Sequence, residues 1–236
     1  MTHDTIARLE HGFIASVQAD DGSPLRDSRM IAALAQATVL GGANGLRINS
    51  PEDIRAVREI TDLPIIGLHK VPGENRDVIT PLVEHAIALA QAGADIIALD
   101  VSRELRGGDL SIIGAVRELT GLPVMADVST LDEGTRATDA GADVVGTTLS
   151  GYTPYTHGDT EAPDFALIEQ LVARGIRVIA EGRLRTPADV VHALSLGAYA
   201  AVVGRALTDP LITSARYARA VTEARSAAAS RAVSGS

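Results

Sequence analysis

The sequence predicts one (β/α)8 barrel, a TIM barrel, over residues 1–225, and three observations carry this prediction. Apolar segments of strand length alternate with helical segments roughly every 25 to 30 residues, so eight strand–helix units fit the chain. The run 115–124 nearly repeats the run 56–65, and a Gly-Ala-Asp tripeptide recurs at 93–95 and 141–143. The length of 236 residues is close to the usual value of about 250. An open doubly wound sheet is the alternative, but it normally has fewer strands, and no G-x-G-x-x-G motif follows the first predicted strand.

Local signals place the elements of the first half of the chain. Ser50 is suited to cap a helix that begins at Pro51, because its side chain can accept a hydrogen bond from the first turn and proline is tolerated there. Leu63 and Pro64 open the third strand, which we expect to end at Lys70. The expected elements are a short helix within 1–12, strand 13–18, helix 28–40, strand 45–49, helix 51–60, strand 63–70, helix 78–92 and strand 96–100.

The second half repeats the same pattern. Helix 115–120 leads into a strand that ends at Asp127, and Thr186 caps a helix before the last strand. The remaining expected elements are helix 131–140, a strand ending near 148, helix 163–173, strand 177–181, strand 199–204 and helix 210–224. The segment 226–236 is rich in Ala, Ser and Arg, and we expect it to be frayed or disordered.

Composition excludes several classes of function. The formal net charge is -9 and no basic stripe is present, so a nucleic-acid-binding surface is not expected. The chain has no Cys, which excludes disulfides and thiol catalysis and is compatible with a reducing compartment. No apolar run approaches the roughly 20 residues of a membrane helix, and residues 1–11 lack the apolar region of a signal peptide. We therefore expect a cytoplasmic protein that binds neither nucleic acid nor membrane.

Lys70 is the only lysine among the 21 basic side chains of the protein. Lysine can lose its proton, whereas arginine effectively cannot, so Lys70 is a candidate acid–base or Schiff-base group. Side chains alternate along a strand, so Lys70 shares a face with the apolar Ile66 and Leu68. His69 points the other way, and we expect it to pack under the helices rather than to act on a substrate.

Polar side chains close the predicted strands, and barrel enzymes place their chemistry at these carboxyl ends. Glu181 follows an apolar strand and is the natural partner for Lys70, with a salt bridge to a nearby arginine as the alternative. Asp100 and Asp127 are expected to contact substrate, although they would also suit a role in orienting Lys70 or in capping the segment that follows. The other candidates for substrate contact are Gln18, Arg47 and Thr148. No histidine or third carboxylate has the spacing of a metal site, so no metal is expected.

Two Gly-Arg pairs indicate a phosphate site. Gly182-Arg183 follow the seventh predicted strand and Gly204-Arg205 follow the eighth, where barrels commonly hold phosphate on backbone N–H groups and the start of a short helix. Glycine allows the backbone to approach a ligand closely. Each pair alone would also fit a simple loop turn. Together they predict a barrel of the phosphate-binding type with a phosphorylated substrate, to which Arg47 would add positive charge unless it forms a buried structural ion pair.

Five motifs resemble one known family along most of the chain. They are Gly-Thr-Thr-Leu-Ser-Gly-Tyr-Thr at 146–153, Val-Ile-Ala-Glu-Gly-Arg at 178–183, Gly-Leu-Arg at 45–47, Ile-Gly-Leu-His-Lys at 66–70 and Met-Ala-Asp-Val-Ser-Thr at 125–130. In this order, between about Gly12 and Thr213, they resemble the N-acetylmannosamine-6-phosphate (N-acylglucosamine-6-phosphate) 2-epimerases. The resemblance implies a homodimeric barrel that converts N-acetylmannosamine 6-phosphate into N-acetylglucosamine 6-phosphate in sialic-acid and aminosugar catabolism, without an added cofactor.

The resemblance also implies roles for individual residues. The family's catalytic Lys and Glu fall on Lys70 and Glu181, and its substrate-contacting Gln, Arg and Asp fall on Gln18, Arg47 and Asp127. Two positions depart from the family. Val71-Pro72-Gly73 replaces a basic residue followed by Asp-Tyr, and Asp209 stands where the family often has Arg in the last loop. Because Asp209 would repel phosphate, the phosphate must be bound there by Arg205 or by backbone N–H groups.

Inversion at a carbon beside a carbonyl needs one group to remove a proton and another to return it on the opposite face. We expect Lys70 and Glu181 to be this pair, with Arg47 stabilising the enolate. A free lysine titrates near about 10.4, so Lys70 must be desolvated or placed near another cation to act as a base. Two alternatives stay open from the sequence: a Schiff-base aldolase or lyase that uses Lys70, and a barrel that binds a phosphosugar without turnover.

Overall fold

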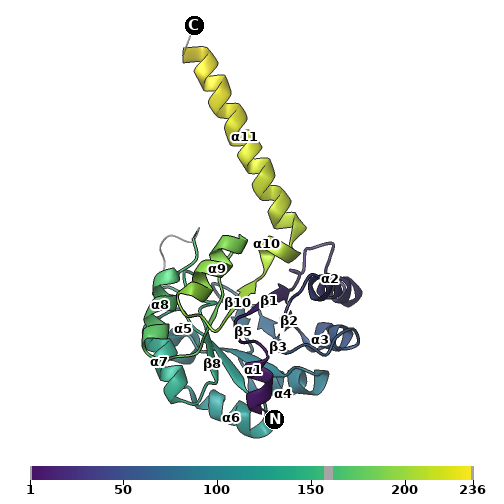
Figure 1. Cartoon of the computed structure of the whole chain (residues 1–236), viewed down its shortest axis with the longest axis vertical. Coiled ribbons are helices and arrows are strands. Elements are labelled where there is room, and N and C mark those ends of the chain that lie inside the picture. The colour runs from purple at the N-terminus through teal and green to yellow at the C-terminus, as the bar shows by residue number, and fades with distance from the viewer. Residues whose placement is uncertain (1, 157–161, 235–236) are drawn as a thin grey trace.

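The computed structural model describes residues 2–156 and 162–234, and its centre is a closed barrel of parallel strands (Figure 1). The strands are β1 (Gly12–Val17), β2 (Gly45–Asn49), β3 (Ile65–Leu68), β6 (Ile96–Asp100), β7 (Val124–Asp127), β8 (Val144–Gly146), β9 (Val178–Ala180) and β10 (Ala200–Val203). Each pairs in parallel with the next in this order, and β10 closes the barrel against β1. The predicted (β/α)8 barrel is confirmed.

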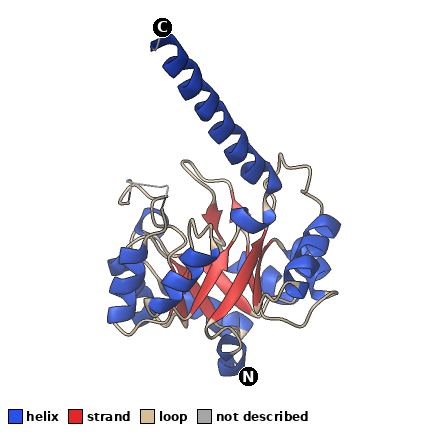
Figure 2. Cartoon of the chain, turned by 45° about the horizontal axis from the view of Figure 1, so that its top comes forward, coloured by secondary structure: helices blue, strands red, loops and turns tan. Residues whose placement is uncertain are grey.

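Helices follow the strands and cover the outside of the barrel (Figure 2). They are α2 (Ser28–Leu40), α3 (Pro51–Arg58), α4 (Val83–Ala92), α6 (Ser111–Thr120), α7 (Leu131–Asp139), α8 (Phe165–Ala173) and α9 (Pro187–Ser195). Strand side chains alternate between two layers. Outward residues such as Leu46 and Val145 pack beneath the helices, and inward residues such as Ile66 and Met125 fill the interior. The barrel is therefore a packed core that leaves room for a ligand only at its ends.

The two sequence repeats perform the same structural task. Arg58 of α3 forms an ion pair with Asp95, and Arg117 of α6 forms one with Asp143. In both cases the carboxylate also accepts a hydrogen bond of 2.9 Å from the first N–H of the strand that follows the helix, β3 or β7. Each repeat thus ties a helix to the amino ends of two neighbouring strands.

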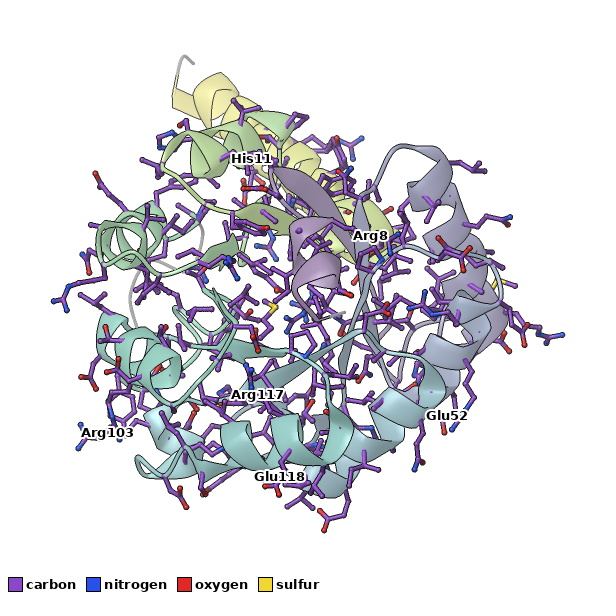
Figure 3. The ribbon with its side chains drawn as sticks, turned by 60° about the horizontal axis from the view of Figure 1, so that its bottom comes forward. Arg8, His11, Glu52, Arg103, Arg117 and Glu118 are labelled. Atoms are coloured by element: carbon purple, nitrogen blue, oxygen red, sulfur yellow. The ribbon has the colours of Figure 1, made fainter. Side chains whose placement is uncertain are left out.

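The amino end of the barrel is closed by the start of the chain. Helix α1 (Thr2–Ala7) lies across this end, beside the labelled Arg8 (Figure 3). Ile6 and Leu9 are buried in the interior cluster, and the Tyr199 hydroxyl donates to the Ile6 carbonyl at 3.3 Å. Arg8 donates to the carbonyl of Asp62 at 2.8 Å. Access to the barrel interior is therefore left at the carboxyl ends of the strands.

The segment after β3 differs from the expected one. β3 ends at Leu68 rather than at Lys70, and β4 (Lys70–Val71) pairs antiparallel with β5 (Val78–Ile79) in a small hairpin. The apolar pair Val78-Ile79, expected to begin a helix, is used in this ladder, so α4 begins only at Val83. A one-turn helix, α5 (Arg103–Arg106), follows β6 and was not predicted. Lys70 thus lies on a hairpin above the barrel rather than on a barrel strand.

The end of the chain is helical where disorder was expected. After the one-turn α10 (Arg205–Thr208), α11 (Pro210–Ser234) continues through the segment from Ser226, whose alanines and arginines are strong helix formers. Residues 235 and 236 lie outside the described part of the chain. α11 projects away from the barrel (Figures 1 and 2). Among the described helices, none has the length and apolar character needed to cross a membrane.

Candidate active site

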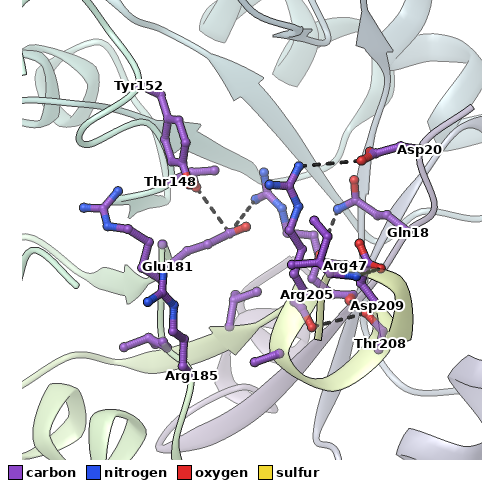
Figure 4. A pocket seen from close by; sticks show the side chains of 18 of the residues that line it. Gln18, Asp20, Arg47, Thr148, Tyr152, Glu181, Arg185, Arg205, Thr208 and Asp209 are labelled. Carbon is purple, nitrogen blue, oxygen red and sulfur yellow. Dashed lines mark hydrogen bonds and ion pairs between the residues drawn. The ribbon is translucent and has the colours of Figure 1, made fainter. Parts of the chain in front are cut away.

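A cavity of about 340 Å³ opens at the carboxyl ends of the strands (Figure 4). The loops after β1, β8, β9 and β10 and the β4–β5 hairpin supply most of its wall. The predicted site residues that line it are Gln18, Arg47, Lys70, Thr148, Glu181, Gly182, Arg183, Gly204 and Arg205. The structure therefore brings together residues that are distant in the sequence, such as Gln18 and Arg205, which lie 187 positions apart.

Arg47 of β2 is the cation at the base of this cavity, and its side chain is 1% exposed. It forms a bidentate ion pair with Asp127 at the end of β7, with Nη2–Oδ2 at 2.7 Å and Nη1–Oδ1 at 3.2 Å. Its Nη1 also lies 3.2 Å from Oε2 of Glu181. Burial alone would lower the pKa of Arg47, but the charges of Asp127 and Glu181 raise it above the ordinary value. The permanently charged guanidinium of Arg47 thus forms ion pairs with two carboxylates.

Glu181 follows β9 and has an unusual titration for a carboxylate. Its Oε2 lies 3.2 Å from the Thr148 hydroxyl, which also donates to Asp127 at 2.6 Å. Burial raises the pKa of Glu181 to about 7, against the opposing charge of Arg47. The nearby charge of Asp127 contributes to this rise. Glu181 can therefore gain or lose a proton near neutral pH, as a general acid–base group requires.

Lys70 faces the same cavity from the β4–β5 hairpin. Burial lowers its pKa, and the positive charges of Arg205 and Arg47 act in the same direction. The carboxylates of Asp20 and Asp77 oppose this shift. Both causes anticipated from the sequence, desolvation and a neighbouring cation, are present. Lys70 thus loses its proton more readily than a lysine in water.

Two of the predicted substrate contacts do not line the cavity. Asp127 lies beneath it and acts through Arg47 and Thr148. Asp100 is fully buried and turned to other partners: Arg76 Nη1 donates to its Oδ2 at 2.6 Å, and the Ser102 hydroxyl donates to its Oδ1 at 2.6 Å. The expected contact between Asp100 and substrate is therefore not supported by its position.

Gln18, which directly follows β1, lines the cavity and has a side-chain oxygen without a partner in the described part of the chain. Its Nε2 donates to the Ser16 hydroxyl at 2.8 Å, while its Oε1 is buried without a partner among the described residues. A buried oxygen that lacks a donor carries a desolvation cost that a ligand N–H or O–H can remove.

The predicted phosphate region combines unusual backbone with positive charge. Gly182 has φ 112° and Arg183 has φ 60°, a conformation that a non-glycine residue adopts at a cost and that clusters at functional sites. The Arg183 guanidinium donates to the carbonyls of Ser150 and Ala162, at 2.7 and 2.5 Å, and lies over the Tyr152 ring. Its side chain thus holds the loop after β8, and both residues of the turn line the cavity.

The structure adds lining residues that the sequence did not single out. Among them are Asp20, Tyr152 and Arg216. Asp20 Oδ2 lies 3.7 Å from Nη2 of Arg205, so the two residues form an ion pair at the rim of the cavity. Arg216 comes from the second turn of α11, a helix whose sequence has no strand-end signal. Asp20 follows Gln18 by two positions, so the rule that sites lie at strand ends could have identified it. The same rule could not have identified Arg216, which lies in a helix.

His69 packs outside the barrel, as expected. Its ring stacks on that of His85 in α4 with centroids 4.5 Å apart, and burial lowers its pKa. The described residues contain no group of three or more His, Asp or Glu side chains arranged to hold a metal ion.

Comparison with known proteins identifies the family. A protein-family model described as "Putative N-acetylmannosamine-6-phosphate epimerase" matches residues 31–223. The chain belongs to this epimerase family. A "Putative N-acetylmannosamine-6-phosphate 2-epimerase" of Caldanaerobacter subterraneus subsp. tengcongensis is 41% identical over 231 residues, which cover 95% of this chain and 97% of that protein. One of the same name from Yersinia pseudotuberculosis is 48% identical over 202 residues, or 85% and 86% of the two chains.

A solved structure agrees with the family assignment. It belongs to the N-acetylmannosamine-6-phosphate 2-epimerase from Clostridium perfringens, which is 37% identical to this chain and superimposes with a TM-score of 0.84. The match covers 91% of this chain and 95% of that one. The epimerase family therefore accounts for almost the whole barrel, and the predicted resemblance is confirmed.

Proposed function

We propose that this member of the family is an epimerase that inverts C2 of N-acetylmannosamine 6-phosphate to give N-acetylglucosamine 6-phosphate in sialic-acid and aminosugar catabolism. The observation that carries the proposal is that Lys70 and Glu181 face one cavity with pKa values displaced toward each other. A hydrogen on C2 becomes acidic when C1 is an aldehyde, so two such groups suffice for inversion without a change in oxidation state.

The chemistry follows from this placement. In the ring-opened sugar one group of the pair takes the C2 proton, and the electron pair moves to the C1 oxygen as an enolate. The other group then returns a proton to the opposite face of C2. Arg47 supplies a fixed positive charge at the base of the cavity, where it stabilises the negative charge that develops.

The remaining cavity residues are suited to hold the sugar phosphate. Gln18 offers its buried oxygen to a hydroxyl or to the acetamido N–H, and Thr148 orients Glu181. The backbone at Gly182-Arg183 and Gly204-Arg205 would hold the phosphate, and two further arginines of the wall add positive charge. Those two arginines are Arg185 and Arg216. They offset the negative charge of Asp209, which also lines the cavity.

Incubation with N-acetylmannosamine 6-phosphate in D₂O, followed by NMR, tests this proposal. We expect N-acetylglucosamine 6-phosphate that carries deuterium at C2. Lys70→Met and Glu181→Gln should each abolish epimer formation, and the variant that lacks the base facing the C2 hydrogen of N-acetylmannosamine 6-phosphate should also lose exchange, whereas Glu118→Gln, on the exposed face of α6, should leave both unchanged. Wild-type enzyme that yields neither product nor exchange would refute the function. Epimer formation at the wild-type rate in Lys70→Met would refute the role of Lys70, and trapping of substrate on Lys70 by borohydride would show a Schiff base instead.

We also propose a homodimer in which α11 forms the contact. Leu211, Tyr217 and Val221 of this helix are exposed, with Tyr217 at 73%. Within the described barrel strands, the apolar residues that are not buried are Phe13 and Val203, and these lie on β1 and β10, which pair with each other. A helix after the last strand would normally cover this seam. A second copy's α11 would bury both apolar surfaces at once.

Sedimentation velocity tests the dimer. Wild type should sediment as a dimer, and Tyr217→Glu should sediment as a monomer because it places a charge in the contact. Leu119→Glu changes another exposed apolar residue, on α6, and should remain dimeric. A monomeric wild type, or a Tyr217→Glu variant as dimeric as the control, would contradict the assembly.

The cytoplasm is the proposed location of the enzyme. A sugar phosphate carries charges that the hydrocarbon core of a bilayer excludes, so its enzyme must work where it is formed. Fractionation of cells that produce the protein should place the epimerase activity with the cytoplasmic fraction.

A further inference from the structure

The β4–β5 hairpin carries Lys70, and several contacts hold this hairpin in place. The Lys70 N–H donates to the Asn49 side chain at 2.9 Å, and Thr80, at the base of the hairpin, exchanges hydrogen bonds with His69. Arg106 of α5 donates to the carbonyls of Thr80 and Pro81. These contacts fix the two ends of the hairpin but do not reach its tip.

The tip of the hairpin is held chiefly by the side chain of Arg76, beside one longer bond of 3.4 Å from the Asn75 amide to Glu104 Oε1. Its Nη1 donates to Asp100 Oδ2 at 2.6 Å, its Nη2 to the Ser102 hydroxyl at 2.9 Å and its Nε to Glu104 Oε2 at 3.1 Å. The Arg76 side chain is 12% exposed and Asp100 is completely buried. The guanidinium therefore joins the hairpin tip to the end of β6 and to the start of α5 with charge-assisted hydrogen bonds.

We propose that Arg76 is a positioning residue for the reaction, because its ion pair with Asp100 holds the hairpin that places Lys70 in the cavity. The inference rests on the proposed epimerase function and adds a role for two residues that do not touch the substrate. It also explains why Asp100, at the carboxyl end of β6, is turned away from the cavity.

Loss of this ion pair changes two properties of Lys70. The hairpin gains freedom, so the amine no longer keeps one distance from C2, and a displacement of about 1 Å can lower a rate by about 100-fold. Water also reaches Lys70, which removes the burial that lowers its pKa. The charged groups that face Lys70 are Asp20, Asp77, Arg47, Arg205 and Glu181, and these remain in the variant.

The test compares Arg76→Gln with matched variants. Arg117→Gln removes an arginine of the same kind of Arg–Asp ion pair, at the amino end of the barrel and away from the hairpin. Arg76→Lys keeps the charge but loses the fork that reaches Asp100, Ser102 and Glu104 together. Asp100→Asn removes the charge of the partner. The double variant of Arg76→Gln with Asp100→Asn tests whether the two residues act as one unit.

We expect kcat of Arg76→Gln to fall about 10- to 100-fold with KM nearly unchanged, since the reacting group and not the substrate is displaced. Arg76→Lys should recover part of the loss, and the double variant should be no slower than the slower single variant. The alkaline limb of the pH–rate profile should move to higher pH. Arg117→Gln should keep the wild-type kcat and pH profile.

A second measurement does not depend on turnover. Because Lys70 is the only lysine, protein labelled with ¹³C at lysine Cε gives one NMR signal, whose titration reports the pKa of Lys70 directly. The midpoint should rise in Arg76→Gln and in Asp100→Asn, and stay in place in Arg117→Gln. A wild-type midpoint together with a wild-type pH profile in both variants would overturn the proposal even if the variants were less stable. A wild-type enzyme without epimerase activity would refute the proposed function alone, since the titration would still test the ion pair.

Discussion

Replacement of Glu181 by Gln tests the burial of this carboxyl as a change in the pH dependence of stability. Gln keeps the shape of Glu but cannot ionise. The folded protein holds the Glu181 proton up to a pKa of about 7, whereas the ordinary value is 4.5. The extra proton in the folded state stabilises wild type fully below pH 4.5, and this contribution is lost as the pH rises through about 7. A displacement of this size corresponds to about 3 kcal/mol.

Urea unfolding of both proteins between pH 4.5 and 8, at one protein concentration, measures this difference. The free energy of unfolding of Glu181→Gln minus that of wild type should increase by up to about 3 kcal/mol over this range and then stay level. Glu118→Gln removes an exposed carboxylate and corrects for the general effect of losing one. A difference that stays constant with pH, or that decreases toward pH 8, would refute the inferred burial of the Glu181 charge.

Three further perturbations test the site and its supports. Titration of the ¹³C-labelled lysine in wild type should place the pKa of Lys70 below the ordinary 10.5, and a midpoint at or above that value would contradict its desolvation. Arg47→Met leaves Asp127 buried without its charged partner and should lower the free energy of unfolding by about 3 to 5 kcal/mol in urea, with loss of turnover. Gly146→Ala brings a methyl group against Met125 and within 2.9 Å of the Asp127 carboxylate, and should lower the free energy of unfolding by about 1 to 3 kcal/mol. Gly114→Ala is the control: its added methyl group meets no atom within 4 Å, so it should not lower the free energy of unfolding.

The features that could be predicted from the sequence are those that depend on periodicity and on the position of polar residues at strand ends. The barrel, most element boundaries and the residues that face the cavity follow from alternation and from the rule that barrel sites lie at the carboxyl ends. Helix α2 and strands β2 and β6 have the expected bounds. Lys70 and Glu181 were assigned in the same way, although Lys70 lies one step beyond the barrel on a hairpin.

The predictions from the sequence were wrong where contacts between residues distant in the chain determine the local structure. The ladder between β4 and β5 needs two residues from each strand, which is too short for a periodic signal, so Val78 and Ile79 resembled the start of a helix. Asp100 ends its strand as Asp127 does, and its different role follows from its partners, among them Arg76, which is 24 positions away in the chain. Strand-end position alone therefore identifies a candidate, whereas the partner of the side chain decides its role.

The opposite pKa shifts of Lys70 and Glu181 suit a reaction that runs in both directions. Burial lowers the pKa of Lys70 and raises that of Glu181, so between the two values the pair holds one transferable proton. This proton lies on the amine or on the carboxylate, and each arrangement contains one acid and one base. In the proposed mechanism one turnover converts the first arrangement into the second, because a proton leaves C2 to one group and arrives from the other. The reverse reaction begins from the arrangement that the forward reaction leaves, so one buried pair serves both directions.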